Sequence, residues 1–361
     1  MAPPGPRSRP LRAFLLPGVF VGLLFYALWS RRPQPTDQIE GRNLTALTGP
    51  IMGTTFSVKV ITAEPTTEAE DTALKADVLG TLTRINESMS TWREDSEVSR
   101  FNRHDSTAPF PLSADTLAVL RAAAQVSAAS DGAFDVTIKP LVNLWKFGSD
   151  AEEWDDPPTN AEIALQLGQV GYTQLTLGRD SVQKAQPSLT IDLGAIAKGY
   201  AVDQVGLALE ARGIGDYMVE VGGEVRVRGQ NAESEDWRIG IERPDALRGT
   251  LEEVIALRDL SLATSGDYRN YYEDDSGQRI SHTIDARTGR PITHILASVS
   301  VLHTEAMMAD AWATALNVLG PEEGLALAEA EGLAVMMLVR EGPGQFTQRT
   351  AGTFDTHRVN P

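Results

Sequence analysis

The chain of 361 residues contains no cysteine. That absence excludes disulfide bonds, thiolate nucleophiles, cysteine-based zinc sites and lipid attachment to an N-terminal cysteine. Basic residues are also scarce, because 32 lysines and arginines face 49 aspartates and glutamates, for a formal net charge of −17. Five of the arginines lie in residues 1–32, which hold no acid, so the remainder is more acidic still. A surface of this charge repels a phosphate backbone and argues against nucleic-acid binding.

Charged side chains are missing altogether from residues 13–30, which follow a basic start at 1–12. A basic start before an apolar run is typical of a signal sequence, and 18 helical residues span roughly 27 Å, close to a ~30 Å hydrocarbon core. No clear A-x-A cleavage site follows the run. We therefore expect an uncleaved transmembrane anchor at 13–30, with a cleaved signal as the alternative. Residues 1–12 would be a cytoplasmic tail, 31–48 a linker, and 49–355 the functional domain outside the membrane.

The body of the chain predicts a single mixed unit of the α+β class. Apolar residues at three- and four-residue spacing predict an amphipathic helix over 67–89, and a second helix begins near Ser113. Further helices are expected at 195–212, 304–319 and 321–331. Strands are expected at 51–61, 174–178, 188–194, 217–229, 237–242 and 297–303. Strands and helices do not alternate strictly, which favours α+β over a doubly wound parallel sheet.

A turn rich in small residues joins an expected strand to an expected helix at 190–200. The strand would end at Asp192, so free backbone amides would point at whatever lies above the turn, and Lys198 would add positive charge. Asp192 could equally be a simple helix cap. The segment is not a phosphate-binding P-loop, because GxxxxGK[ST] is absent, and no GxGxxG occurs.

Asp310 and Thr314 lie four residues apart in an expected helix, so their oxygens share one face. Hard oxygen ligands of this kind suit Mg²⁺, which normally keeps water and phosphate oxygens as its other ligands. The alternative is a solvated helix face, which fits poorly with the apolar neighbours of Asp310.

Two further residues are candidates for chemistry on weaker grounds. His282 lies between strand-like apolar positions and could transfer a proton, although such a histidine is more often structural. Trp92 lies beside polar residues and could stack on a planar ring, or it could be a core residue. No Ser-x-Gly elbow or HExxH occurs, which argues against a serine hydrolase or a zinc peptidase.

Eight segments occur in an order that resembles one known family. They are IMGT at 51–54, MSTW…S…FN at 89–102, GAFDVTIKPLVNLW at 132–145, TIDLGAIAKGYAVD at 190–203, VEVGGE at 219–224, ATSGDYRNYY at 263–272, SHTIDARTGRPI at 281–292 and ADAWATAL at 309–316. Together they resemble the ApbE family of bacterial FAD:protein FMN transferases. The resemblance covers roughly 50–345.

The resemblance implies an enzyme that binds FAD and Mg²⁺, moves FMN onto a Ser or Thr hydroxyl of a partner protein and releases AMP. It implies a place on the outer, periplasmic face of the bacterial inner membrane, and an acceptor that is a subunit of a membrane redox complex. His282 would handle the proton. The residues expected to line the FAD site are Met52, Trp92, Ala133, Phe134, Asp135, Asp192, Lys198 and Ile284. Those expected to hold the metal are the Ala195 carbonyl, Asp310 and Thr314.

Three positions depart from the family pattern. Some relatives carry an acid where this chain has Ala313, and some carry an acid at position 198. Glu224 stands where a shorter side chain often follows the paired glycines, and we interpret it as structural. The same motifs also allow an FAD diphosphatase, which would give FMN and AMP, or a non-catalytic periplasmic flavin-binding protein.

Overall fold

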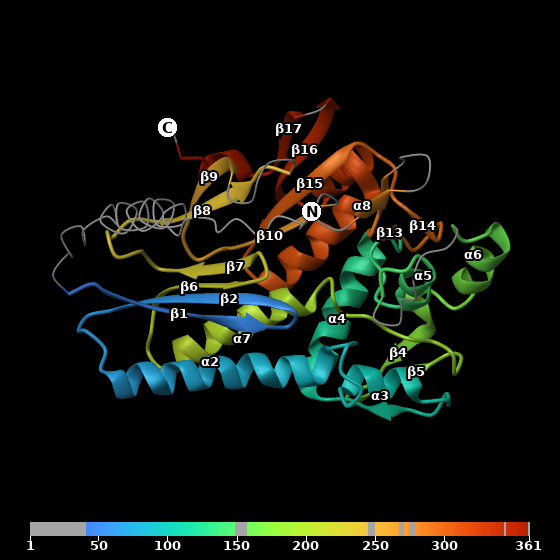
Figure 1. Ribbon diagram of the computed structural model, residues 1–361, viewed down its shortest axis with the longest axis horizontal. Helices are drawn as coiled ribbons and strands as arrows, with labels where there is room; N and C mark the ends of the chain where they lie inside the picture. Colours follow the sequence, from blue (N-terminus) through green and yellow to red (C-terminus); the bar gives the residue numbers. More distant parts are fainter. Residues whose placement is uncertain are drawn as a thin grey trace, which may run out of the picture. The chain divides into compact units, whose positions relative to one another are not determined.

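A single large sheet organises the domain (Figure 1). The computed structural model describes residues 41–148, 157–244, 250–266, 271–273, 279–342 and 344–359. The sheet has eight strands in the order β1-β2-β6-β7-β10-β15-β16-β17, and every neighbouring pair is antiparallel. The strands are β1 (Asn43–Ile51), β2 (Thr54–Thr62), β6 (Asp216–Val221), β7 (Glu224–Arg228), β10 (Ser261–Gly266), β15 (Leu296–His303), β16 (Ala334–Gly342) and β17 (Gln345–Ala351).

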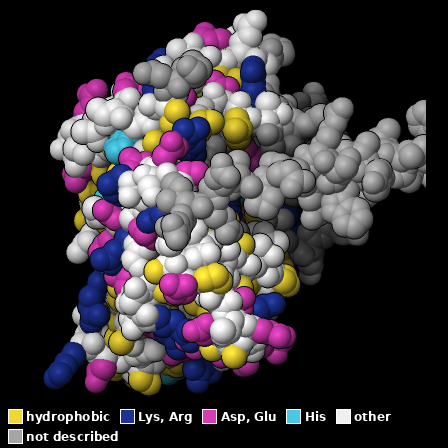
Figure 2. Space-filling model, turned by 90° about the vertical axis from the view of Figure 1, so that its left-hand side faces the viewer, with side chains coloured by type: hydrophobic (Ala, Val, Ile, Leu, Met, Phe, Trp, Pro, Cys, Tyr) yellow, Lys and Arg dark blue, Asp and Glu magenta, His cyan; other side chains and the backbone are white. Residues whose placement is uncertain are grey.

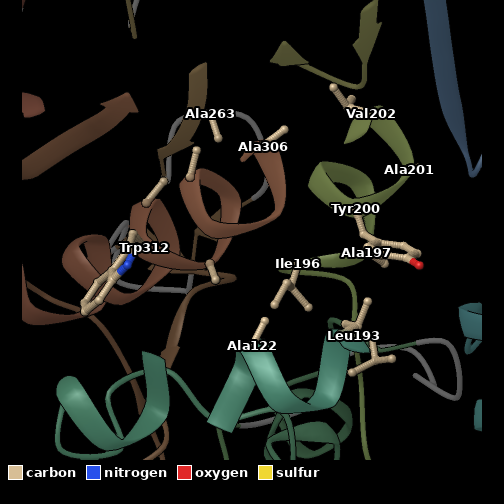
Figure 3. Packing of buried hydrophobic residues seen from close by; sticks show 14 of the residues in the cluster. Ala122, Leu193, Ile196, Ala197, Tyr200, Ala201, Val202, Ala263, Ala306 and Trp312 are labelled. Carbon is tan, nitrogen blue, oxygen red and sulfur yellow. The ribbon is translucent and has the colours of Figure 1, made fainter. Parts of the chain in front are cut away.

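Helices cover one face of this sheet. They are α2 (Glu68–Met89), α7 (Ala197–Ala211) and α8 (Ala306–Ala330). α7 packs on β6 and β7, α8 packs on β10 and β15, and α2 packs on α7 (Figure 1). Gly320 (φ 81°) has a non-helical backbone and divides α8 at a kink just before Pro321, in agreement with the two helices expected at 304–319 and 321–331. The small residues of α7 and α8 bring these helices close, and Ile196 points toward Ala122 (Figure 3).

The opposite face of the sheet is covered by a hairpin of β8 (Trp237–Glu242) and β9 (Leu251–Leu257), together with η3 (Phe354–His357). Alternation along the strands separates the two cores. On β6, Val219 and Val221 face the helices, whereas Val225 and Val227 of β7 belong to the hairpin side. This period of two is what a sheet covered on both faces requires.

A second group of elements adjoins the helical side. Its three-stranded sheet has the order β3-β5-β4. The group contains α3 (Glu97–Arg103), β3 (Phe110–Pro111), α4 (Ala114–Ala129), α5 (Lys139–Leu144), α6 (Asn160–Leu167), η2 (Tyr172–Gln174), β4 (Leu175–Leu177) and β5 (Ser181–Lys184). Two short ribbons complete the described part, β11 (Tyr271–Glu273) with β12 (Arg279–Ser281) and β13 (Ile284–Asp285) with β14 (Arg290–Pro291).

The expected α+β class is confirmed, and the helices predicted at 67–89 and from Ser113 are present. The strand predicted at 188–194 is wrong. Asn102 takes the place of a partner strand, because its side-chain amide donates to the Ile191 carbonyl (2.8 Å) and accepts from the Ile191 amide (2.7 Å). The sheet also begins earlier than expected, because residues 43–48 of the predicted linker pair with β2 as part of β1.

The anchor predicted at 13–30, like the tail before it, lies outside the described residues. Within the described ranges, no helix combines the length and the apolar character that a membrane crossing needs. On the face shown in Figure 2, acidic and basic side chains are interspersed, so this face presents no extended basic patch.

Candidate functional site

A cavity of about 430 Å³ opens where the first turn of α7, the β6–β7 turn, the end of β10 and α8 meet the segment 282–284. Most of the residues predicted for the site line this one cavity. They are Ala133, Phe134, Asp135, Asp192, Ala195, Lys198, His282, Ile284, Asp310 and Thr314. The structure therefore gathers most of the predicted flavin-binding residues and all of the predicted metal-binding residues, from four separate sequence motifs, around one space.

Two hydrogen bonds of Asp192 hold the turn before α7. Asp192 Oδ1 accepts a hydrogen bond from the Gly194 amide (2.8 Å), and the Asp192 amide donates to the Val136 carbonyl (2.7 Å). Burial raises the pKa of Asp192, and the Gly194 amide opposes that shift. The first helical residue is Ala197, and no side chain caps the helix. Of the first four amides of α7, that of Ala197 donates to the Leu193 carbonyl (2.8 Å), that of Gly199 to Asp310 and that of Tyr200 to the Ile196 carbonyl (3.1 Å). Within the described residues, the Lys198 amide is the one at this helix start without an acceptor.

Lys198 lies between two buried carboxylates. Its ammonium Nζ is 2.6 Å from Glu224 Oε1 and 3.8 Å from Asp310 Oδ1. Burial alone lowers the pKa of Lys198, but the charges of Asp310 and Glu224 outweigh burial and raise it above its ordinary value. Lys198 is therefore a fixed positive charge in the cavity wall.

Glu224, which the sequence analysis interpreted as structural, lines the cavity and pairs with Lys198. It begins β7 directly after Gly222 (φ 65°) and Gly223 (φ 111°), whose left-handed backbone turns the chain back. Its side chain is buried and lines the cavity, and burial raises the pKa of Glu224 to about 7 against the opposing charge of Lys198. Its Oε2 atom is buried and has no hydrogen-bond partner in the described part of the chain.

Asp310 is also buried, at 5% exposure, so the alternative of a solvated helix face is wrong. Its Oδ2 accepts a hydrogen bond from the Gly199 amide (3.0 Å). In a regular helix that amide would donate to the carbonyl of Ala195. Because it donates to Asp310 instead, it does not occupy the Ala195 carbonyl, and Ala195 lines the same cavity. Burial raises the pKa of Asp310, against the effects of Lys198 and the Gly199 amide.

Asp135 lines the cavity, but its carboxylate holds its own loop together. Oδ1 accepts from the amide (2.8 Å) and hydroxyl (2.6 Å) of Thr137, and Oδ2 accepts from the Tyr172 amide (2.7 Å). Burial raises the pKa of Asp135, and these three hydrogen bonds oppose the shift. The neighbouring Phe134 ring is buried against the main core.

Met52 and Trp92 are not brought into the wall of the cavity. Met52 (φ 49°) forms the turn between β1 and β2 and packs against the main core. Trp92 follows the end of α2 and is 75% exposed. The prediction that Met52 and Trp92 line the FAD site therefore stays a prediction, and the cavity described here does not include them.

His282 lies half-buried in the cavity wall next to the Phe147 ring, with ring centroids 6.2 Å apart in an edge-on arrangement. Hydroxyls that the sequence analysis did not single out lie in the same wall, namely Thr264, Ser265 and Thr283. Thr283 is held by Asn317, whose amide nitrogen approaches its hydroxyl (3.4 Å) and that of Ser265 (3.3 Å). The cavity thus combines an imidazole, several hydroxyls, a fixed cation and the three buried carboxylates of Asp135, Glu224 and Asp310.

A second cavity, of about 550 Å³, lies next to the first and shares Val318 with it. Its polar side chains include Arg287, Arg290 and His294. None of the predicted site residues lines it. We therefore assign the chemistry to the smaller cavity.

Comparison with known proteins gives the family of the chain. The model of the ApbE family matches residues 52–337. The FAD:protein FMN transferase of Vibrio cholerae is 42% identical over 321 residues, which cover 89% of this chain and 93% of that protein. The FAD:protein FMN transferase of Escherichia coli K12 is 36% identical over 334 residues, with 91% and 93% covered.

Solved structures of flavin transferases are also similar to this chain. The flavin transferase ApbE from Vibrio cholerae superposes with a TM-score of 0.80 at 40% identity, covering 88% of this chain and 99% of that one. The apo form of the Pseudomonas stutzeri flavinyl transferase ApbE also reaches 0.80, at 39% identity, covering 90% and 99%. Fold and sequence together define a flavin transferase architecture. The chain belongs to the ApbE family.

Proposed function

We propose that this enzyme transfers the FMN part of FAD to a Ser or Thr hydroxyl of a partner protein and releases AMP. The observation that carries the proposal is the shared cavity, in which Lys198, the start of α7 and the buried Asp310 face the same space as His282. The relatives named FAD:protein FMN transferase support the same reaction.

The diphosphate of FAD would lie at the start of α7. A free amide at a helix start and a fixed ammonium bind phosphate oxygens well, and Lys198 provides both, through its backbone amide and its side chain. This local device explains how an acidic protein can bind an anionic nucleotide. The apolar wall of Phe134, Val142 and Ile284 would contact a planar ring of the nucleotide.

The described residues contain no group of three or more histidine, aspartate or glutamate side chains that could hold a metal. Mg²⁺ does not need such a group, because it is bound by one or two carboxylates together with substrate phosphates. Lys198, Glu224 and Asp310 carry one negative charge in excess when all are ionised, and Glu224 Oε2 is unpartnered. These features fit a divalent cation held by Asp310, Thr314 and the Ala195 carbonyl. When bound, it would offset the charge on the diphosphate.

His282 would accept the proton of the acceptor hydroxyl. The hydroxyl oxygen attacks the phosphorus on the flavin side and forms a new P–O bond. The bond from that phosphorus to the bridging oxygen breaks, and AMP leaves with the bridging oxygen. The Lys198 ammonium would stabilise negative charge on the departing phosphate. Water in place of the hydroxyl would give FMN and AMP, which is the diphosphatase reaction.

Intact-mass measurement tests the proposal. The chain from Gly41 onward is incubated with FAD, Mg²⁺ and a candidate acceptor protein, and the acceptor is then weighed. We expect a gain of one FMN and the release of AMP. Release of FMN and AMP without a gain in acceptor mass would identify a diphosphatase, and unchanged FAD would identify a flavin-binding protein.

We further propose that the apolar segment 13–30 holds the enzyme at the periplasmic face of the inner membrane. The motivating feature is the uncharged run after a basic start. The acceptor would then be a membrane redox-complex subunit with a hydroxyl on the same side of the membrane.

A further inference from the structure

The start of α8 is capped by a side chain from another helix. Its own N-cap residue, Glu305, makes no side-chain capping bond. Instead, Asp203 of α7 accepts the Ala306 amide on Oδ1 (2.9 Å) and the Met307 amide on Oδ2 (2.9 Å). Amides at a helix start lack partners within the helix, and leaving them unbonded in a buried place is unfavourable. Ala306 is fully buried, so water cannot accept a hydrogen bond from its amide, and Asp203 accepts it instead.

A second contact joins the same two helices one turn away. Gly199 lies four residues before Asp203, on the same face of α7. Its amide donates to Asp310, and a Cβ atom at this position would lie 2.3 Å from the Ala306 carbonyl oxygen. The backbones are therefore in direct contact, and only glycine fits. Two points on α7 thus fix both the position and the rotation of α8.

Asp203 is itself held from the sheet. Arg226 of β7 donates to Asp203 Oδ1 (2.7 Å) and to the Tyr217 hydroxyl (3.1 Å). Asp203 is 7% exposed, and its carboxylate receives three hydrogen bonds, two of them from α8. A buried carboxylate with this many fixed donors has little freedom to move.

The functional groups of the cavity are attached to these same two helix starts. Ala195 and Lys198 lie at the start of α7, whereas Asp310 and Thr314 lie one and two turns into α8. We propose that Asp203 is a positioning residue that sets the separation between the α7 groups and the α8 groups. The inference rests on the proposed function, because it concerns the assembly of a site for Mg²⁺ and the FAD diphosphate. Asp203 does not line the cavity and acts only through α8.

Asp203→Asn tests this role. The asparagine side chain has the size of the aspartate side chain but only one acceptor oxygen. The two backbone amides of α8 and Arg226 together use both oxygens of the carboxylate. Residues that orient metal ligands typically change metal affinity 10–100-fold when replaced. We expect the Mg²⁺ concentration for half-maximal transfer to rise roughly 10–100-fold. The stabilisation of the FAD-bound protein by added Mg²⁺, measured as a shift in Tm, should shrink in parallel.

Thr67→Ala is the matched control. Thr67 is the N-cap of α2, and its hydroxyl accepts a hydrogen bond from the Glu70 amide at an exposed helix start. The substitution removes this cap. This control should lower Tm and leave the Mg²⁺ curve unchanged. Asp203→Glu is a second variant that keeps the charge and both acceptor oxygens but lengthens the side chain. It should fold and still shift the Mg²⁺ curve, because α8 is displaced.

The inference is overturned if both Asp203 variants have the wild-type Mg²⁺ curve and the wild-type Mg²⁺-dependent shift in Tm, whatever their own stability. It is also overturned if Thr67→Ala shifts the curve as strongly as they do. A wild type that transfers no FMN under any Mg²⁺ concentration would instead refute the proposed function. The two failures are therefore distinguishable.

Discussion

Glu224 Oε1 accepts a hydrogen bond from the Lys198 ammonium at 2.6 Å, in a wall where Glu224 is almost completely buried. The pair joins the first turn of α7 to the first residue of β7. Removing two charges from water is unfavourable unless their remaining polar atoms are bonded, and Glu224 Oε2 is not bonded in the described residues. The pair therefore includes a buried carboxylate oxygen without a hydrogen bond, and carboxylates with pKa values perturbed in this way are common in active sites.

The first prediction concerns the pH dependence of stability without ligand. Burial raises the pKa of Glu224 from 4.5 to about 7, so the folded chain binds this proton more tightly than the unfolded chain does. The free energy of unfolding should then fall as pH rises from about 4.5 to about 7, by at most about 3 kcal/mol from this group. Glu224→Gln should flatten the dependence of Tm on pH across this window.

The control for Glu224→Gln is Glu233→Gln, which changes an exposed loop residue by the same chemistry. It should keep the slope of the wild type. Equal slopes for wild type and Glu224→Gln would show that the buried pair does not set the pH dependence.

The second prediction concerns His282. If the imidazole accepts the proton of the attacking hydroxyl, His282→Ala should bind FAD normally but transfer FMN roughly 10²–10⁴-fold more slowly. FAD binding by fluorescence and transfer by acceptor mass separate the two effects. His357→Ala, which changes a histidine in η3 beside the β-hairpin, should behave as wild type. Weaker FAD binding with normal turnover at saturation would make His282 a binding residue.

Local sequence signals predicted the helices because their apolar patterns match the helical period, whereas the strand expected at 217–229 is in fact two strands, β6 and β7. Apolar positions recur every three to four residues in α2, and paired glycines turn the chain at 222–223. The strand expected at 188–194 failed because Asn102, nearly ninety residues earlier in the chain, bonds the backbone of Ile191. No local pattern shows which distant side chain satisfies a backbone group.

The sequence indicated which residues lie at the site better than it indicated the contacts between them. Motifs placed Asp310, Lys198 and His282 in one cavity, where the structure also has them. Glu224 was missed because its role depends on burial beside Lys198, which arises only when β7 and α7 pack together. The one local signal for Glu224 was its position, as a charged residue directly after two glycines at the start of a strand. Similarly, Asp203 caps a helix more than one hundred residues away, so its capping role is a tertiary property.

The third prediction concerns where the folded domain begins. β1 pairs with β2 from Asn43 to Ile51, and its residues Leu47 and Ile51 pack against the main core. A chain starting at Gly41 should therefore fold and transfer FMN. A chain starting at residue 52 loses this edge strand, exposes β2 and should be less stable or aggregate. Thermal unfolding and size-exclusion chromatography compare the two, and equal Tm values would show that β1 contributes nothing.

The last prediction concerns Asp310, where the carboxylate has two roles that separate variants can distinguish. Asp310→Asn keeps an oxygen for the Gly199 amide but loses the charge that a divalent cation needs, so the fold should persist while transfer requires far more Mg²⁺. Asp310→Ala also leaves that buried amide unbonded, which should cost about 1–3 kcal/mol of stability in addition. Thr314→Ala should shift the Mg²⁺ curve less, because water can replace a neutral hydroxyl.

The control is Glu323→Gln, which changes an exposed acid on the same helix and should match wild type. Transfer rate against Mg²⁺ concentration and Tm are measured for all five proteins. A wild type that EDTA does not inhibit, or an Asp310→Asn variant with the wild-type Mg²⁺ curve, would place the metal elsewhere.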